Sequence, residues 1–158
     1  MNLRVAARWL ALAGIAALAG CASSDKPPPT PLETVEPRIA GRQVWASSVG
    51  RVGFPLVPAA HGGVFHVASG DGDVLALQAE HGAVLWRANA GGALSAGVGS
   101  DGRFTSVVTR GNEVVTFDGG RELWRKRLPS SAVTPPLVAG ERVFVMGVDR
   151  AVHAFDAL

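Results

Sequence analysis

A repeat of about 40 residues limits the folds open to this chain more than any other feature. Three stretches superimpose: GDGDVLALQAEHGAVLWRAN, RGNEVVTFDGGRELWRKR and VDRAVHAFDAL. One apolar position recurs in them at steps of 40 and 38 residues, as Val74, Val114 and Val152. The copies consist of short alternating runs between Gly-containing turns, without a convincing helical period, which favours β-strands. A unit of this length made only of strands is typical of a β-propeller blade.

The repeat predicts an all-β fold, an incomplete β-propeller of about two and three-quarter four-stranded antiparallel blades. The first unit is expected to contain strands Pro55–Ala59, Val64–Ala68, Asp73–Gln78 and Ala83–Ala88. The second is expected to contain Leu94–Val98, Arg103–Thr109, Glu113–Phe117 and Arg121–Lys126. The third offers Ala132–Val138, Arg142–Gly147 and Ala151–Phe155, without a fourth strand.

Tryptophans mark the ends of the units. Trp86 and Trp124 correspond, 38 residues apart, and Trp45 lies in a similar stretch, Gln43–Gly50, which resembles an outer strand. We expect these rings to fill the gaps between neighbouring twisted sheets, as structural residues of the repeat. Since propellers often let their first strand complete the last blade, Gln43–Gly50 is expected to be such a closing strand.

The N-terminus has the composition of a secretory signal. Two arginines precede an apolar run, Trp9–Gly20, which is shorter than the ~20 residues that span a bilayer. The run ends in LAGC, which resembles the lipobox of bacterial lipoproteins. That resemblance implies a signal peptide over residues 1–20, cleavage between Gly20 and Cys21, and lipidation of Cys21, palmitate included. The alternative is an ordinary secreted protein in which Cys21 is incidental.

Composition excludes several classes of site. Cys21 is the only cysteine, so neither an intrachain disulfide nor a cysteine-based zinc site can form. The chain has 15 Lys and Arg against 13 Asp and Glu, and two of the arginines precede residue 20. The mature protein is therefore formally neutral, which gives no argument for nucleic-acid binding. The basic cluster Arg121–Arg127 is expected to form a solvated face.

A stretch rich in proline, Cys21–Gln43, separates the lipobox from the repeats. Five prolines fall between Pro27 and Pro37, which favours an extended, semi-rigid tether that holds a domain away from a membrane.

No catalytic, metal or cofactor set is predicted. The aspartates fall mostly at turns, where they favour local hydrogen bonds. His61 and His81 are expected to be solvated, and His66 and His153 to satisfy local hydrogen bonds within strands. The Gly-rich stretch around Ser100 is interpreted as a hairpin turn, because no helix follows it that could bind a phosphate.

The unit endings EHGAVLW (Glu80–Trp86) and DGGRELW (Asp118–Trp124) resemble the pyrroloquinoline-quinone-type propeller repeat. Together with the lipobox and tether, they make the chain similar to the BamB family, the lipoprotein subunit of the outer-membrane β-barrel assembly machinery. The resemblance implies an eight-bladed, non-enzymatic scaffold without a cofactor. It would be lipid-anchored at the periplasmic face of the outer membrane of a Gram-negative bacterium. Its partners would be the barrel assembly subunit, other members of that complex and unfolded outer-membrane proteins.

The repeat count departs from that family, and we expect a truncated member: a fragment, a frameshifted reading frame or a prematurely ended gene. Fewer than three blades fall short of the ~4–8 that close a ring. Assembly of several copies into a ring is the alternative. Two other functions are weighed, a fragment of a quinoprotein dehydrogenase and a propeller adaptor of another envelope complex.

Overall fold

A computed structural model describes residues 29–33 and 39–158. Residues 41–158 form one compact unit. The tether residues 29–33 and 39–43 are exposed and carry neither helix nor strand. The predicted signal peptide, its cleavage site and Cys21 lie outside the described residues. Within the described ranges, no helix has the length and apolar character needed to cross a membrane.

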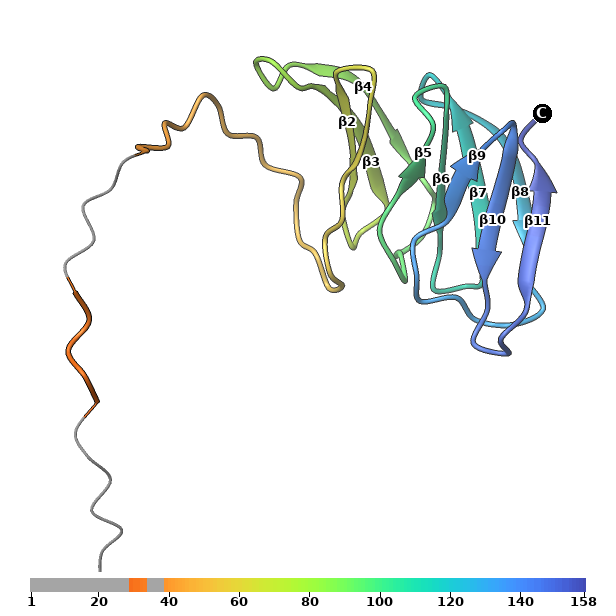
Figure 1. Ribbon diagram of the computed structural model, residues 1–158. Coiled ribbons are helices and arrows are strands. Elements are labelled where there is room, and N and C mark those ends of the chain that lie inside the picture. The colour runs from red at the N-terminus through yellow and green to blue at the C-terminus, as the bar shows by residue number, and fades with distance from the viewer. Residues whose placement is uncertain (1–28, 34–38) are drawn as a thin grey trace, which may run out of the picture. The chain divides into compact units, whose positions relative to one another are not determined.

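Within residues 59–156, three antiparallel sheets follow one another, and each is a meander of consecutive strands (Figure 1). We call them blades 1, 2 and 3. Blade 1 contains β1 (Ala59–His61), β2 (Val64–Ala68), β3 (Asp73–Gln78) and β4 (Val84–Asn89). Blade 2 contains β5 (Gly99–Ser100), β6 (Phe104–Val108), β7 (Glu113–Asp118) and β8 (Arg121–Arg127). Blade 3 contains β9 (Leu137–Ala139), β10 (Arg142–Met146) and β11 (Val152–Asp156).

The predicted all-β propeller fold with three in-phase units is confirmed, and the middle strands lie close to their predicted positions. β2 and β3 have the predicted bounds, β7 and β8 are each one residue longer at the C-terminal end, and β11 is shifted by one residue at both ends. Blades 1 and 2 also share a β-bulge, between Ala76 and Leu77 and between Thr116 and Phe117. The two sheets are therefore copies of one another in backbone detail as well as in sequence.

The innermost strand of every blade was predicted too early in the sequence. The residues of the predicted strand Leu94–Val98 form a largely buried segment that passes from blade 1 to blade 2, and strand β5 begins only at Gly99. Leu94 donates its amide to Gly70 of blade 1, whereas Ser95 donates its amide to Val108 of blade 2. The segment is apolar because two sheets enclose it, and alternation alone cannot separate such a segment from a strand.

Prolines explain the same displacement in the other two blades. The predicted strands Pro55–Ala59 and Ala132–Val138 contain Pro55 and Pro58 in the first case and Pro135 and Pro136 in the second. Because proline cannot donate to a ladder, regular pairing starts only after these residues, at Ala59 and Leu137.

The core lies between the sheets. Between blades 1 and 2, a cluster of fully buried side chains includes Val74 and Ala68 on one side and Val107 and Phe117 on the other. A second cluster contains side chains of blades 2 and 3, among them Phe104, Val108, Val114, Val143 and Val145. The sheet of the middle blade is thus apolar on both faces, and each face is covered by a neighbouring blade.

Candidate interaction surfaces

Each repeat tryptophan extends from the outer part of one unit onto the next blade. Trp86 on β4 joins the cluster that contains Val107, Val115 and Phe117 of blade 2. Trp124 on β8 packs against the ring of Phe155 in blade 3, at 5.8 Å between centroids, and donates from Nε1 to the carbonyl oxygen of Ala157, at 3.2 Å.

Trp45 makes the same contact with blade 1. Its Nε1 donates to the carbonyl oxygen of Ala79 at 2.9 Å, and its ring lies 6.3 Å from that of Phe65. Ala79 and Ala157 occupy the same repeat position, one residue after β3 and β11. The Trp45 indole therefore binds blade 1 through the same hydrogen bond as the Trp124 indole makes with blade 3. The segment Gln43–Gly50, however, pairs with no strand among the described residues.

The tryptophan contact depends on a glycine in the turn before the outer strand. Gly82 has a φ of +71° and Gly120 a φ of +87°, the left-handed region that favours glycine. A Cβ on Gly82 would lie 2.6 Å from the Trp45 ring, and one on Gly120 would lie 3.1 Å from Cε3 of Trp86. The Gly in the repeated D/E-x-G-x-x-x-W ending thus provides both the turn and the space for the preceding unit's indole.

Blade 3 exposes an apolar face that the other two blades bury. Val74 and Val114 are both 0% exposed, whereas Val152, at the same repeat position, is 59% exposed. This exposed face, which we call the trailing face, borders a groove of about 350 Å³ lined by Thr134, Pro135, Leu137, Phe144, Met146 and Val152.

Blade 1 presents an apolar face at the opposite end of the stack, which we call the leading face. Its groove of about 270 Å³ is lined by Leu56, Pro58, Phe65, Val67 and Leu77, together with Trp45, Ser47 and Val49. The last three alternate along the chain and point toward blade 1, as one face of a strand does. Trp45 and Val49 are half-buried, whereas Ala46, Ser47 and Ser48 are exposed.

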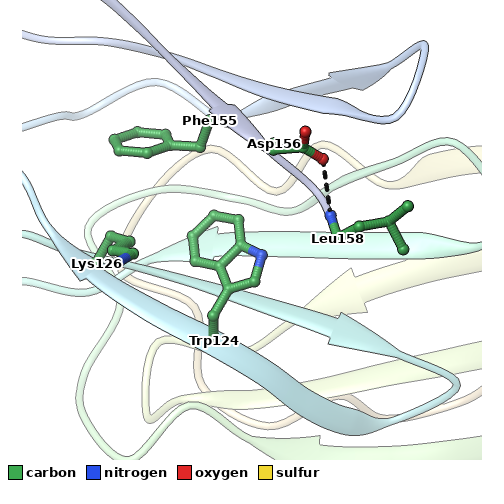
Figure 2. A pocket seen from close by; sticks show the side chains of 5 residues that line it. All are labelled: Trp124, Lys126, Phe155, Asp156 and Leu158. Carbon is green, nitrogen blue, oxygen red and sulfur yellow. Dashed lines mark hydrogen bonds between the residues drawn. The ribbon is translucent and has the colours of Figure 1, made fainter.

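The outer edge of blade 3 carries a third groove, of about 330 Å³. Trp124, Lys126, Phe155, Asp156 and Leu158 line it (Figure 2). In the described residues no strand pairs with β11 on the side away from β10. At the equivalent place in blades 1 and 2, β4 and β8 complete the sheet.

The predicted basic cluster is not uniformly solvated, because Arg125 is half-buried and hydrogen-bonded to its surroundings. Its guanidinium donates to Glu113 at 3.1 Å, to Glu122 at 2.9 Å and to the carbonyl oxygen of Ala90 at 2.9 Å. These hydrogen bonds to the two carboxylates raise the pKa of Arg125. The last bond ties blade 2 to the segment that leaves blade 1, so this residue holds neighbouring blades together.

The four histidines have different surroundings. His61 and His81 are exposed, as predicted. His66 is 2% exposed, and its Nδ1 has no hydrogen-bond partner within the described chain, so the predicted local satisfaction is wrong for that atom. Burial lowers the pKa of His66, because the charged imidazolium loses its hydration. His153 Nε2 likewise lacks a hydrogen bond there and lies 3.8 Å from Asp149 Oδ2.

The aspartates at turns accept local backbone hydrogen bonds, as predicted. Asp101 accepts the amide of Phe104 at 2.8 Å, Asp149 that of Ala151 at 3.1 Å and Asp156 that of Leu158 at 3.1 Å. The bond from Ala151 lowers the pKa of Asp149. Over residues 29–33 and 39–158, no group of three or more His, Cys, Asp or Glu side chains could hold a metal ion.

Successive antiparallel sheets, each joined to the next by an indole, define a protein of the β-propeller class. The sequence profile described as outer membrane protein assembly factor BamB matches residues 33–93 and 70–158. This chain belongs to the BamB family.

Relatives and solved structures agree with this assignment. The chain is 37% identical to outer membrane protein assembly factor BamB of Burkholderia pseudomallei and 34% identical to that of Bordetella pertussis, over 99% of this chain and 43% of each relative. It thus spans less than half the length of these relatives. The crystal structure of BamB from Moraxella catarrhalis matches 70% of this chain and 34% of its own, with a TM-score of 0.59 and 26% identity. A europium-containing methanol dehydrogenase shares the fold at 19% identity, with a TM-score of 0.53 over 73% of this chain and 25% of its own.

Proposed function

We propose that this chain is a non-catalytic scaffold lipoprotein that takes part in the assembly of outer-membrane proteins. Lipidation at Cys21 would anchor it to the periplasmic face of the outer membrane, and the Pro-rich tether would hold the propeller blades away from the bilayer. The barrel assembly subunit and the other members of its complex would be its partners. The observation that carries the proposal is the match to the BamB family, which extends over residues 33–158 in two overlapping stretches.

The outer strands offer a physical route to binding unfolded clients. β4 forms an edge of blade 1, and its residues Val84 and Leu85 are each 51% exposed. An extended peptide can add to such an edge through main-chain hydrogen bonds. The edge of β8 is less suited to this role, because Arg121, Lys126 and Arg127 are exposed along it, and charged side chains protect edges from pairing.

Binding to the purified barrel assembly subunit tests the proposal. The full chain, purified in detergent from a Gram-negative host, is expected to bind that subunit in biolayer interferometry. Mass spectrometry is expected to show acyl chains on Cys21, and a Cys21→Ser variant is expected to lose them while its purified form still binds. Absence of binding by the lipidated chain would contradict the scaffold role. Stoichiometric uptake of pyrroloquinoline quinone with Ca²⁺ in calorimetry would instead support the hypothesis of a quinoprotein dehydrogenase fragment.

A further inference from the structure

We infer that the junction of blades 1 and 2 holds a docking site for an acidic side chain of a partner protein, with Arg51 and Arg110 as its two cationic residues. The inference does not use the assembly-factor function. It rests on a groove of about 360 Å³ whose lining includes Arg51, Gly53, Gly70, Asp71, Ala93 and Arg110. These residues lie in the segment before β1, in the turns that follow β2 and β6, and between β4 and β5.

Backbone hydrogen bonds fix the walls of the groove. The amide of Gly70 donates to the carbonyl oxygen of Arg51 at 2.6 Å, and the carbonyl oxygen of Gly70 accepts the amide of Leu94 at 3.1 Å. The amide of Arg110 donates to the carbonyl oxygen of Ala93 at 2.7 Å. Both arginine side chains therefore extend from backbone that is bonded to a neighbouring segment.

The fold requires an arginine at neither position. An equivalent backbone hydrogen bond occurs once in each unit. Its donor and acceptor are Gly70 and Arg51, Arg110 and Ala93, and Val148 and Ser131, at 2.6, 2.7 and 2.8 Å. Because alanine and serine serve in place of Arg51, and glycine and valine in place of Arg110, the two guanidinium groups add something that the packing of the blades does not need.

Arg110 presents the free end of its guanidinium to the groove. Its Nε donates to the carbonyl oxygen of Leu94 at 3.3 Å, and its Nη2 lies 3.4 Å from the position that a Cβ on Gly53 would take. In the part of the chain that the structure describes, no hydrogen bond or ion pair uses Nη1 or Nη2. A guanidinium oriented through Nε in this way can donate from both terminal nitrogens to the two oxygens of one carboxylate.

Arg51 supplies a second cation. Its Nη2 lies 3.3 Å from Oδ1 of Asp71, and the two side chains are 89% and 58% exposed. An ion pair this exposed contributes little, so Arg51 can turn toward a ligand at small cost. Two arginines against one aspartate leave one net positive charge in the groove. That charge matches a single carboxylate better than a phosphate monoester, which carries nearly two negative charges.

The floor of the groove gives a partner close access. Gly53, Gly70 and Ala93 contribute a single methyl group among them, so the backbone of an incoming segment can approach the blade junction. A loop or an extended segment that carries Glu or Asp could then place its carboxylate between the two arginines. Because the contact is electrostatic and open to solvent, it should weaken as salt is added.

Fluorescence anisotropy with labelled peptides tests the site on the full chain carrying Cys21→Ser. The peptide Gly-Ser-Glu-Glu-Gly-Ser is expected to bind at least about tenfold more tightly at low salt than its neutral match Gly-Ser-Gln-Gln-Gly-Ser. Inorganic phosphate is expected to compete poorly. The absence of a preference for the acidic peptide, or tighter binding of phosphate than of that peptide, would overturn the proposal.

Substitutions taken from the repeat locate the binding. Arg110→Val and Arg51→Ala introduce residue types found at the equivalent positions, so both variants should keep the circular dichroism spectrum of the parent. Arg110→Val is expected to weaken binding of the acidic peptide about tenfold, and Arg51→Ala about threefold. Arg121→Ala, which removes an exposed arginine of β8, is the matched control and should leave binding unchanged.

A charge reversal gives a second, independent result. Arg110→Glu is expected to bind Gly-Ser-Lys-Lys-Gly-Ser more tightly than the acidic peptide, because the groove then carries a net negative charge. Equal weakening by Arg110→Val, Arg51→Ala and Arg121→Ala would show a diffuse attraction between charges and would refute the site. The scaffold function, which is tested by binding to the barrel assembly subunit, would be unaffected by that outcome.

Discussion

The repeat places a valine at one equivalent position in all three units but in two different environments, so substitutions there measure the effect of burial on stability. Val74 and Val114 are fully buried between blades, whereas Val152 is 59% exposed on the trailing face. Valine and threonine have nearly the same shape, so substitution mainly adds a hydroxyl group. We compare Val114→Thr with Val152→Thr as a matched pair.

The expected magnitudes differ severalfold. A hydroxyl buried without a hydrogen-bond partner costs about 1–3 kcal/mol, so Val114→Thr should lower the free energy of unfolding by about 2 kcal/mol. With a urea m-value of about 2 kcal/mol per M, the midpoint should fall by about 1 M. An exposed substitution usually changes stability by less than about 0.5 kcal/mol, so Val152→Thr should shift the midpoint by less than about 0.3 M.

Urea unfolding followed by tryptophan fluorescence measures both midpoints. If Val152→Thr destabilises the protein as much as Val114→Thr, the trailing face is covered within the chain and the reasoning is wrong.

Three further predictions concern contacts within the stack. Gly120→Ala should destabilise the protein more than Gly119→Ala in urea unfolding: both residues have positive φ, at a cost of about 1–2 kcal/mol, but only Gly120 also abuts the Trp86 ring. The free energy of unfolding should fall as the pH drops below about 6.5, because burial lowers the pKa of His66 and the unfolded chain then binds the proton more readily. Urea unfolding at pH 7.5 and at pH 5 should show this fall, and His66→Leu should reduce the difference between the two pH values. Arg125→Lys should cost about 1 kcal/mol or less in the same assay, less at high salt, since lysine cannot reproduce the fork of bonds to two glutamates and Ala90; an unchanged midpoint at low salt would contradict this role.

The periodic middle strands could be predicted from the sequence, since alternation and turn chemistry act over a few residues. β2 and β3 begin and end where the pattern of apolar and glycine residues predicts. The equivalence of Val74, Val114 and Val152 is also visible in the sequence, because each copy of the repeat encodes the same local structure.

The repeat, its middle strands and the positions of its tryptophans follow from the amino-acid sequence alone. The packing of the sheets was needed to show that Leu94 crosses between them, that His66 is buried with no hydrogen bond at Nδ1 within the described residues, and that Val152 is exposed where Val114 is not. The physical reason is that burial of a sheet face depends on the sheet beside it. Identical residues in identical local structure therefore differ in energy according to whether a neighbouring blade covers them.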